Sequence, residues 1–171
     1  MQRIKKDLSE AICELLKGVK SINDIEVNDI SKKAGCHRSS VRRYFPTPGE
    51  FVKYYLGKMF DEYLQIRDIS LYSPQRAQSF FSICLKHKAV LLALHRDGLL
   101  SIAIDVLNEK FIILSDNKDI TADQMFKLFW HTGGLCNTLI RWVSEGMTES
   151  PEQLAAFYSA NVGENTKYMW E

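Results

Sequence analysis

The chain contains no apolar run long enough to cross a bilayer. Hydrophobic residues make up 46% of its 171 positions, but a membrane-spanning helix needs about 20 consecutive apolar residues. The most apolar stretch is broken by His95, Arg96 and Asp97. The N-terminal sequence MQRIKKDLSEAI is charged and amphipathic, without the apolar segment of a signal peptide. The sequence therefore predicts a cytoplasmic protein with no membrane partner.

The motifs of common catalytic and metal sites are also missing. We find no phosphate-binding glycine loop, no H-E-x-x-H and no Ser-His-Asp order. The four cysteines form no C-x-x-C pair, which favours reduced, buried thiols. We therefore expect no enzymatic activity, no cofactor and no metal. A zinc or thiol site remains a third hypothesis, and its ligands would come from Cys84, His87, His95, His131 and Cys136.

Apolar residues follow helical spacing along the whole chain, and alternation with period two is missing. We therefore predict an all-α fold of about nine helices without strands. The first helix carries a stripe from Ile4 to Val19 and ends at Gly18, before a polar turn over residues 21–24. Further helices are predicted over 27–34, 37–44, 48–66, 75–94 (one broken helix or two short ones), 99–114, 121–145 and 151–170.

Residues 31–45 hold five Lys or Arg side chains and no carboxylate. Gly35 separates two short predicted helices and supplies the left-handed or otherwise strained turn that a steep crossing requires. On the second helix, Val41 is expected to face inward with Phe45, while Arg38, Ser39 and Arg42 face outward. Such a cationic helix fits the major groove of B-DNA, which admits one helix between phosphate walls.

The charge distribution supports this interpretation. Residues 1–67 carry 13 Lys or Arg against 9 Asp or Glu, whereas residues 68–171 carry 9 against 12. The net charges of +4 and −3 would draw a polyanion to the N-terminal part. The next helix is marked by Thr47-Pro48-Gly49-Glu50, which predicts a hydroxyl cap, a first-turn proline and a capping box.

The last two predicted helices carry apolar stripes that need a partner. One stripe contains Leu128, Thr132, Leu135, Leu139 and Trp142, and the final helix offers Leu154, Phe157, Tyr158, Val162, Tyr168 and Met169. These stripes either complete the core of the monomer or form a homodimer as a four-helix bundle. We favour the homodimer, because paired reading helices about 34–36 Å apart reach successive major grooves. The pair Gly133-Gly134 would allow close approach of another helix or a ligand, or mark a kink.

The sequence resembles the tetracycline-repressor (TetR/AcrR) family of bacterial transcription regulators. The resemblance is densest over residues 4–56 and rests on AICELL, Ile25 to Ile30, Lys33-Ala34-Gly35, Arg38-Ser39-Ser40 and Tyr44-Phe45. Residues 131–135 and 142–147 are similar to one variant of the regulatory domain of the family. The resemblance implies a helix-turn-helix DNA-binding domain over 1–48, and a helical-bundle domain over 49–171 that binds ligand and dimerises.

The resemblance further implies a sequence-specific regulator on a palindromic operator in double-stranded DNA, in most cases a repressor released by a small-molecule effector. Expected DNA contacts come from Asn28, Arg38, Ser39, Ser40, Arg42, Tyr44 and Thr47. An effector pocket would be lined by Phe81, Cys84, His87, Leu91, Phe111, Trp130 and Asn137, although a place in the core is the better interpretation for most of these residues.

Three positions depart from the pattern of the family. Glu26 stands where a capping threonine is common, Arg42 where an aromatic residue is usual, and Pro48 where a lysine is frequent. Glutamate is a weaker cap and adds a negative charge near DNA, whereas Arg42 would still bind a phosphate or a guanine. These departures motivate an alternative function: a helical protein-interaction module or coregulator that has lost specific DNA binding.

Overall fold

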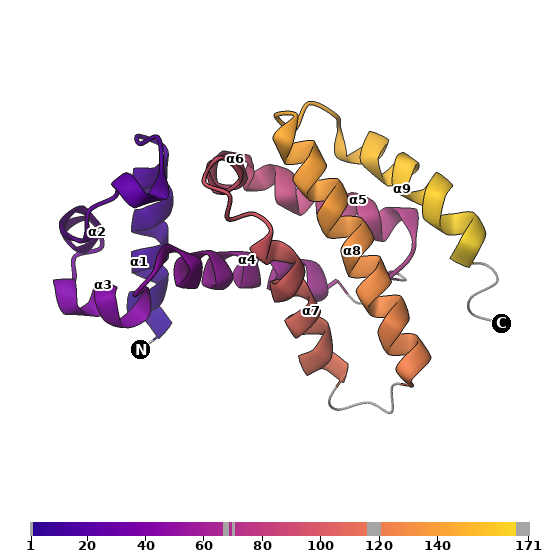
Figure 1. The fold of residues 1–171 in the computed structure, drawn as a ribbon, viewed down its shortest axis with the longest axis horizontal. Coiled ribbons are helices and arrows are strands. Elements are labelled where there is room, and N and C mark those ends of the chain that lie inside the picture. The colour runs from indigo at the N-terminus through magenta and orange to yellow at the C-terminus, as the bar shows by residue number, and fades with distance from the viewer. Residues whose placement is uncertain (1, 67–68, 70, 116–120, 167–171) are drawn as a thin grey trace.

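The computed structural model describes residues 2–66, 69, 71–115 and 121–166, and this part of the chain is all helical. It contains nine α-helices and one short 3₁₀ helix, with no strand in the described ranges, which confirms the predicted fold class (Figure 1). The helices are α1 (Gln2–Leu16), η1 (Ile22–Asp24), α2 (Val27–Lys33), α3 (Arg38–Tyr44), α4 (Pro48–Leu64), α5 (Pro74–Lys86), α6 (Lys88–Arg96), α7 (Ile102–Ser115), α8 (Ala122–Ser144) and α9 (Pro151–Thr166).

Helices α1, α2 and α3 pack together at one end of the molecule. Their shared interior contains Leu8, Ile12 and Val41, which are between 0% and 3% exposed. At the surface, Lys33 Nζ lies 2.5 Å from Glu14 Oε2 and ties α2 to α1. The inward position of Val41 and the part of the predicted stripe from Leu8 to Leu16 are therefore confirmed. At the two ends of the stripe, Ile4 is 37% exposed and Val19 lies beyond the end of α1.

The turn between α2 and α3 has the conformation predicted from Gly35. Gly35 has a φ of +62°, and its N–H donates to the Lys32 carbonyl while the Cys36 N–H donates to the Ser31 carbonyl. These two bonds satisfy the last carbonyls of α2 in a Schellman motif. A Cβ at position 35 would meet no atom within 4 Å, so only the backbone conformation favours glycine here.

This geometry gives a first testable prediction. Gly35→Ala is expected to lower the free energy of unfolding by about 1 kcal/mol, because alanine is strained at positive φ. Gly133→Ala is the matched control: a Cβ there also meets nothing within 4 Å, but Gly133 lies inside α8. That substitution is expected to raise stability by up to about 1 kcal/mol. Urea unfolding measures both, and equal shifts would contradict the explanation.

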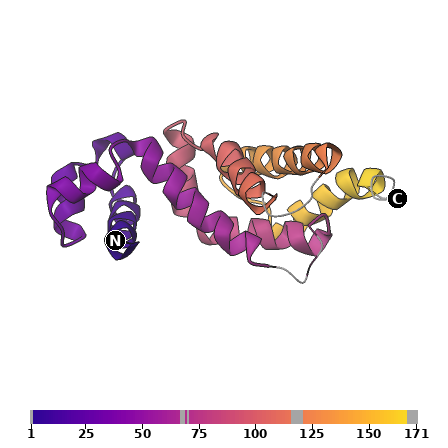
Figure 2. The ribbon, with the colours of Figure 1, turned by 90° about the horizontal axis from the view of Figure 1, so that it is seen from below.

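Helix α4 joins the N-terminal three helices to the others without a break (Figures 1 and 2). Thr47 Oγ1 accepts a hydrogen bond from the Glu50 backbone N–H at 3.3 Å, and Pro48 is the first helical residue. The cap is therefore as predicted, although only the Thr47 half of the predicted capping box forms. At its start α4 buries Phe51 beside Phe45, and near its end it buries Phe60 beside Phe80.

The remaining helices form the larger part of the molecule. Helix α9 packs chiefly on α5, α8 packs on α6 and α7, and α4 packs on α5 and α7. The segment predicted as one broken helix or two short ones is two helices, which meet at His87. Figure 2 places α9 at the end of the molecule opposite α1–α3.

One predicted boundary differs from the structure by three residues. Helix α7 begins at Ile102 rather than Leu99, because Leu99 N–H donates back to the Leu94 carbonyl and so completes the turn that closes α6. The last helix was predicted to reach residue 170, and α9 is described as far as Thr166. Tyr168, Met169 and most of the polar break predicted at 115–119 lie outside the described residues.

The stripe on α8 is buried within the chain. Thr132, Leu135, Leu139 and Trp142 are at most 2% exposed, since α8 lays this face on its neighbours. These residues complete the core of the monomer, so the expectation that this stripe forms a subunit interface was wrong for these four positions. The helix continues through Gly133 and Gly134, and a Cβ at Gly134 would lie 3.6 Å from the Tyr158 ring of α9.

A search of the described helices finds none that is both long enough and apolar enough to span a membrane.

Candidate functional site

Helix α3 presents a cationic face to solvent. Arg38, Ser39 and Arg42 are exposed, while Val41 on the opposite side is 1% exposed. Arg38 and Arg42 are one turn apart and therefore project from the same side of the helix. The apolar underside holds α3 against α1 and leaves both guanidinium groups accessible to a ligand.

No carboxylate within the described residues forms an ion pair with Arg38 or Arg42. The neighbouring cations behave differently: Lys33 pairs with Glu14, and the Arg43 guanidinium lies 4.9 Å from the centre of the Tyr44 ring. The positive charge of Arg38 and Arg42 is therefore uncompensated by the described part of the chain, as a surface that binds phosphate requires.

The other residues predicted to contact DNA lie near this face, but they are partly buried or already hydrogen-bonded. Ser40 and Tyr44 are half-buried, and Tyr44 packs against the core. Asn28 is half-buried in the first turn of α2. Thr47 is exposed, but its hydroxyl already accepts the Glu50 N–H. Their predicted roles stay predictions.

Two departures from the family pattern can be located. Glu26 is the N-cap residue of α2, is exposed, and its side chain makes no capping hydrogen bond. This agrees with the expectation that glutamate is a weak cap. Pro48 is exposed in the first turn of α4. Neither residue disturbs the helix that it begins.

The residues predicted to line an effector pocket do not surround one cavity. Phe81, Cys84, Leu91 and Phe111 are at most 5% exposed and belong to the hydrophobic core. Helix packing buries them, which was the alternative for these residue types. Burial also raises the pKa of the Cys84 thiol well above its ordinary value, so this thiol is a core group.

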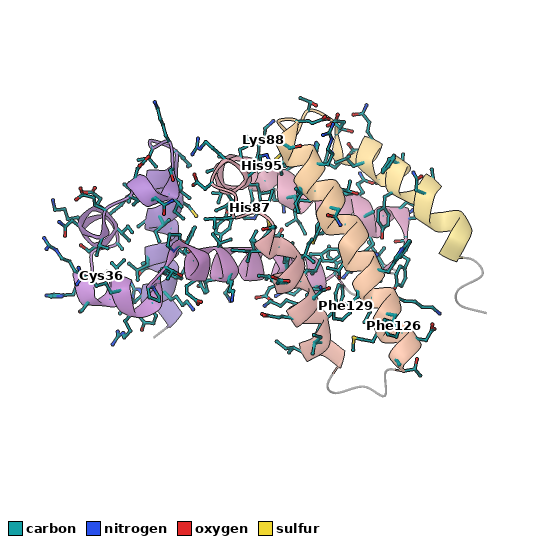
Figure 3. The ribbon with its side chains drawn as sticks, viewed as in Figure 1. Cys36, His87, Lys88, His95, Phe126 and Phe129 are labelled. Atoms are coloured by element: carbon teal, nitrogen blue, oxygen red, sulfur yellow. The ribbon has the colours of Figure 1, made fainter. Side chains whose placement is uncertain are left out.

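The other three predicted pocket residues lie apart from that core. His87 is half-buried at the α5–α6 junction, where its Nδ1 lies 2.6 Å from the Tyr55 hydroxyl. Trp130 and Asn137 are exposed on α8. Figure 3 shows Phe126 and Phe129 at the beginning of α8, away from His87 and His95. The exposed side of this helix is therefore aromatic as well as polar.

The hypothesis of a zinc site receives no support from the geometry. Within the described ranges, no three His, Cys, Asp or Glu side chains are grouped closely enough to hold a metal ion. His131 instead bonds to tyrosines: its Nδ1 to the Tyr158 hydroxyl, and its Nε2 at 3.4 Å from the Tyr63 hydroxyl.

Two features escaped sequence reasoning. A groove of about 710 Å³ lies between α1 and α4, with Lys5, Tyr54, Lys58 and His87 in its lining, and Lys5 Nζ lies 4.5 Å from the centre of the Tyr54 ring. Arg76 is 4% exposed within the first turn of α5. The sequence contained one indication that Arg76 would face inward: it lies four positions before Phe80 and so shares the helix face of that residue.

Comparison of the chain with models of known protein families and with curated proteins gives no match.

Proposed function

We propose that the protein is a sequence-specific DNA-binding transcription regulator of the TetR/AcrR type, in which α2, Gly35 and α3 act as a helix-turn-helix. The observation that carries this proposal is the exposed pair Arg38 and Arg42, directly above the buried Val41. A helix anchored on one side and cationic on the other can enter a major groove without rearrangement. The proposed protein has no catalytic role.

In this proposal the role of each residue follows from its position. Arg38 and Arg42 fork onto guanine edges or phosphates, and Ser39 lies beside them to read a base or a phosphate. Tyr44 and the exposed start of α4 at Thr47 meet the adjacent backbone, where helix amides favour an anion. The phosphate contacts fix the register of α3, and the contacts with bases select the operator.

The proposed regulator is a homodimer formed through α8 and α9. Support comes from a groove of about 470 Å³ lined by residues of both helices, among them Asn137, Arg141 and Phe157. Phe157 is 59% exposed, so its ring offers apolar surface beside this groove to a second copy. A second copy that fills this groove would pair the two α3 helices on one face of the duplex.

The test is selection of binding sites from random duplex DNA with the full chain. The proposal predicts enrichment of a palindrome whose half-sites are about 10 base pairs apart, centre to centre. Enrichment of an unrepeated half-site would retain DNA binding and exclude the paired arrangement. Recovery of no sequence that binds more tightly than about 1 μM at physiological salt would reject the regulator.

One observation favours a second function, a helical interaction module without specific DNA recognition. Glu26 places an exposed, uncapped carboxylate at the start of α2, where a phosphate would approach. Glu26→Thr separates the two proposals, because a regulator weakened by this charge should gain DNA affinity. An interaction module should remain at the affinity of non-specific binding.

A further inference from the structure

The guanidinium of Arg76 is buried without an adequate counter-charge. Its residue is 4% exposed, and the guanidinium carbon lies 4.6 Å from the centre of the Tyr63 ring. Nε and Nη1 are both buried and lack a hydrogen-bond partner within the described residues. An arginine cannot lose its proton, and a buried charge without a partner is strongly destabilising. Some group that compensates it is therefore expected.

The surroundings of Arg76 add further positive potential. The described residues include no carboxylate that forms an ion pair with it. Arg76 lies in the first turn of the thirteen-residue helix α5, which contains no acidic residue. This is the positive end of the helix dipole, where a cation is unfavourable and an anion is favoured. The Arg76 side chain and the N-terminus of α5 therefore both favour a negatively charged ligand.

His131 beside this site is neutral and adds no second positive charge. Its residue is 1% exposed, and burial together with the Arg76 charge lowers its pKa to about 3. Its Nδ1 pairs with the Tyr158 hydroxyl and its Nε2 lies 3.4 Å from the Tyr63 hydroxyl. In the tautomer that carries the N–H at Nε2, the Tyr63 oxygen accepts this hydrogen, and the Tyr63 O–H is left to donate to a ligand.

Aromatic rings enclose these donors. The Tyr72 ring centre lies 4.8 Å from that of His131, the Phe111 ring centre 6.5 Å from it, and the Phe80 ring centre 5.2 Å from that of Tyr63. Tyr72 is half-buried, so the cluster reaches the surface at this ring. The environment combines hydrogen-bond donors with apolar walls, which suits an anion that has an apolar body.

We infer that Arg76, Tyr63 and His131 form a binding site for a small organic carboxylate between α4, α5, α8 and α9. The carboxylate supplies the missing negative charge and two acceptor oxygens to the guanidinium. Its apolar body lies against the rings of Tyr72 and Phe111. Six residues predicted as pocket lining are absent from this site, and Phe111 alone joins it.

The regulatory part of this inference rests on the proposed function. Tyr63 lies near the end of α4, and the same helix begins at Pro48 beside α3. At 1.5 Å per residue its seventeen residues span about 25 Å. A carboxylate on Arg76 would therefore act on α4, the helix that follows α3 and its DNA-binding face, and would be the effector of the proposed regulator.

The test measures binding to the full chain in the absence of DNA. Sodium acetate and sodium benzoate are the probes, acetamide and benzamide are their neutral matches, and sodium chloride keeps ionic strength constant. Titration is followed by the arginine Nε–H resonances in ¹⁵N NMR spectra and by the melting temperature. One or both carboxylates, at up to about 10 mM, should move the Arg76 resonance and raise the melting temperature. The amides should do neither.

Two variants make the result decisive. Arg76→Met identifies the Arg76 resonance and should weaken carboxylate binding at least about tenfold. Without ligand it should melt no lower than the wild type, since it removes a buried charge that lacks a partner. Asp68 lies outside the described ranges, and Asp68→Asn tests whether its carboxylate, rather than a ligand, pairs with Arg76. A similar fall in melting temperature for both variants would overturn the inference.

The inference would also be overturned if neither carboxylate moved the Arg76 resonance, or if chloride moved it equally. These outcomes leave the DNA-binding proposal standing, because no DNA is present. Conversely, carboxylate binding to a protein that selects no DNA sequence would retain the site and reject the regulator.

Discussion

Replacing both Arg38 and Arg42 by alanine is expected to weaken binding to the selected operator at least about thirtyfold. Each arginine that forks onto a base contributes about 1–3 kcal/mol of discrimination, so two lost contacts in each subunit exceed 2 kcal/mol. The fold should survive, because both side chains are exposed and neither pairs with a carboxylate in the described ranges. Fluorescence anisotropy with labelled duplex measures the change.

The salt dependence of the same binding separates base contacts from phosphate contacts. If the four arginines of a dimer bind phosphates, the slope of log K against log salt should fall by about 3 to 4 units. Lys20→Ala with Lys86→Ala removes the same charge from exposed positions away from α3. This control should change affinity less than about threefold. Equal losses in both double variants would show that net charge alone attracts DNA.

Acidification is expected to destabilise the folded protein through His131. Its pKa is about 3 in the folded chain against an ordinary value of 6.5, chiefly because it is buried. Between these values the unfolded chain binds a proton that the folded chain does not, so stability falls as pH decreases. The contribution is complete above pH 6.5 and declines by about 1.4 kcal/mol per pH unit. At pH 4.5 roughly 2 to 3 kcal/mol should be lost.

The control for this effect is His131→Gln, which removes the titration and keeps a polar side chain. Its free energy of unfolding at pH 7 should be lower, since the bonds to Tyr158 and Tyr63 are disturbed. Between pH 7 and pH 4.5, however, its decline should be smaller than that of the wild type. Urea unfolding across this range gives both curves. Parallel curves would assign the acid sensitivity to other groups.

The features that the sequence predicted correctly depend on neighbours in the chain. The conformation of Gly35 and the Thr47 cap follow from interactions within a few residues. The inward position of Val41 and Phe45 follows from helical period, because a short amphipathic helix has one face to bury. Local interactions of this kind can be predicted from the sequence without knowledge of the fold.

The features that were missed depend on which helices meet. Leu135 and Leu139 would serve a subunit interface or a core equally well, and packing of α8 on α6 and α7 decided for the core. Phe81 and Leu91 are buried in the same core, and their place in a pocket lining stays a prediction. Arg76 and His131 are 55 positions apart in the sequence, so no spacing rule connects them. Their proximity arises only when α5 and α8 are placed against α4.

Helix α4 also limits how the molecule can be divided. A fragment ending at residue 48 would uncover Phe45, whose ring packs edge-on against Phe51. A fragment beginning at residue 65 would uncover Phe80, which stacks on Phe60. The α1–α3 part and the part after α4 thus both need the seventeen residues of α4 to cover their buried aromatic side chains. Because α4 is one continuous helix from Pro48 to Leu64, movement of one part of the molecule relative to the other would tilt or bend this helix.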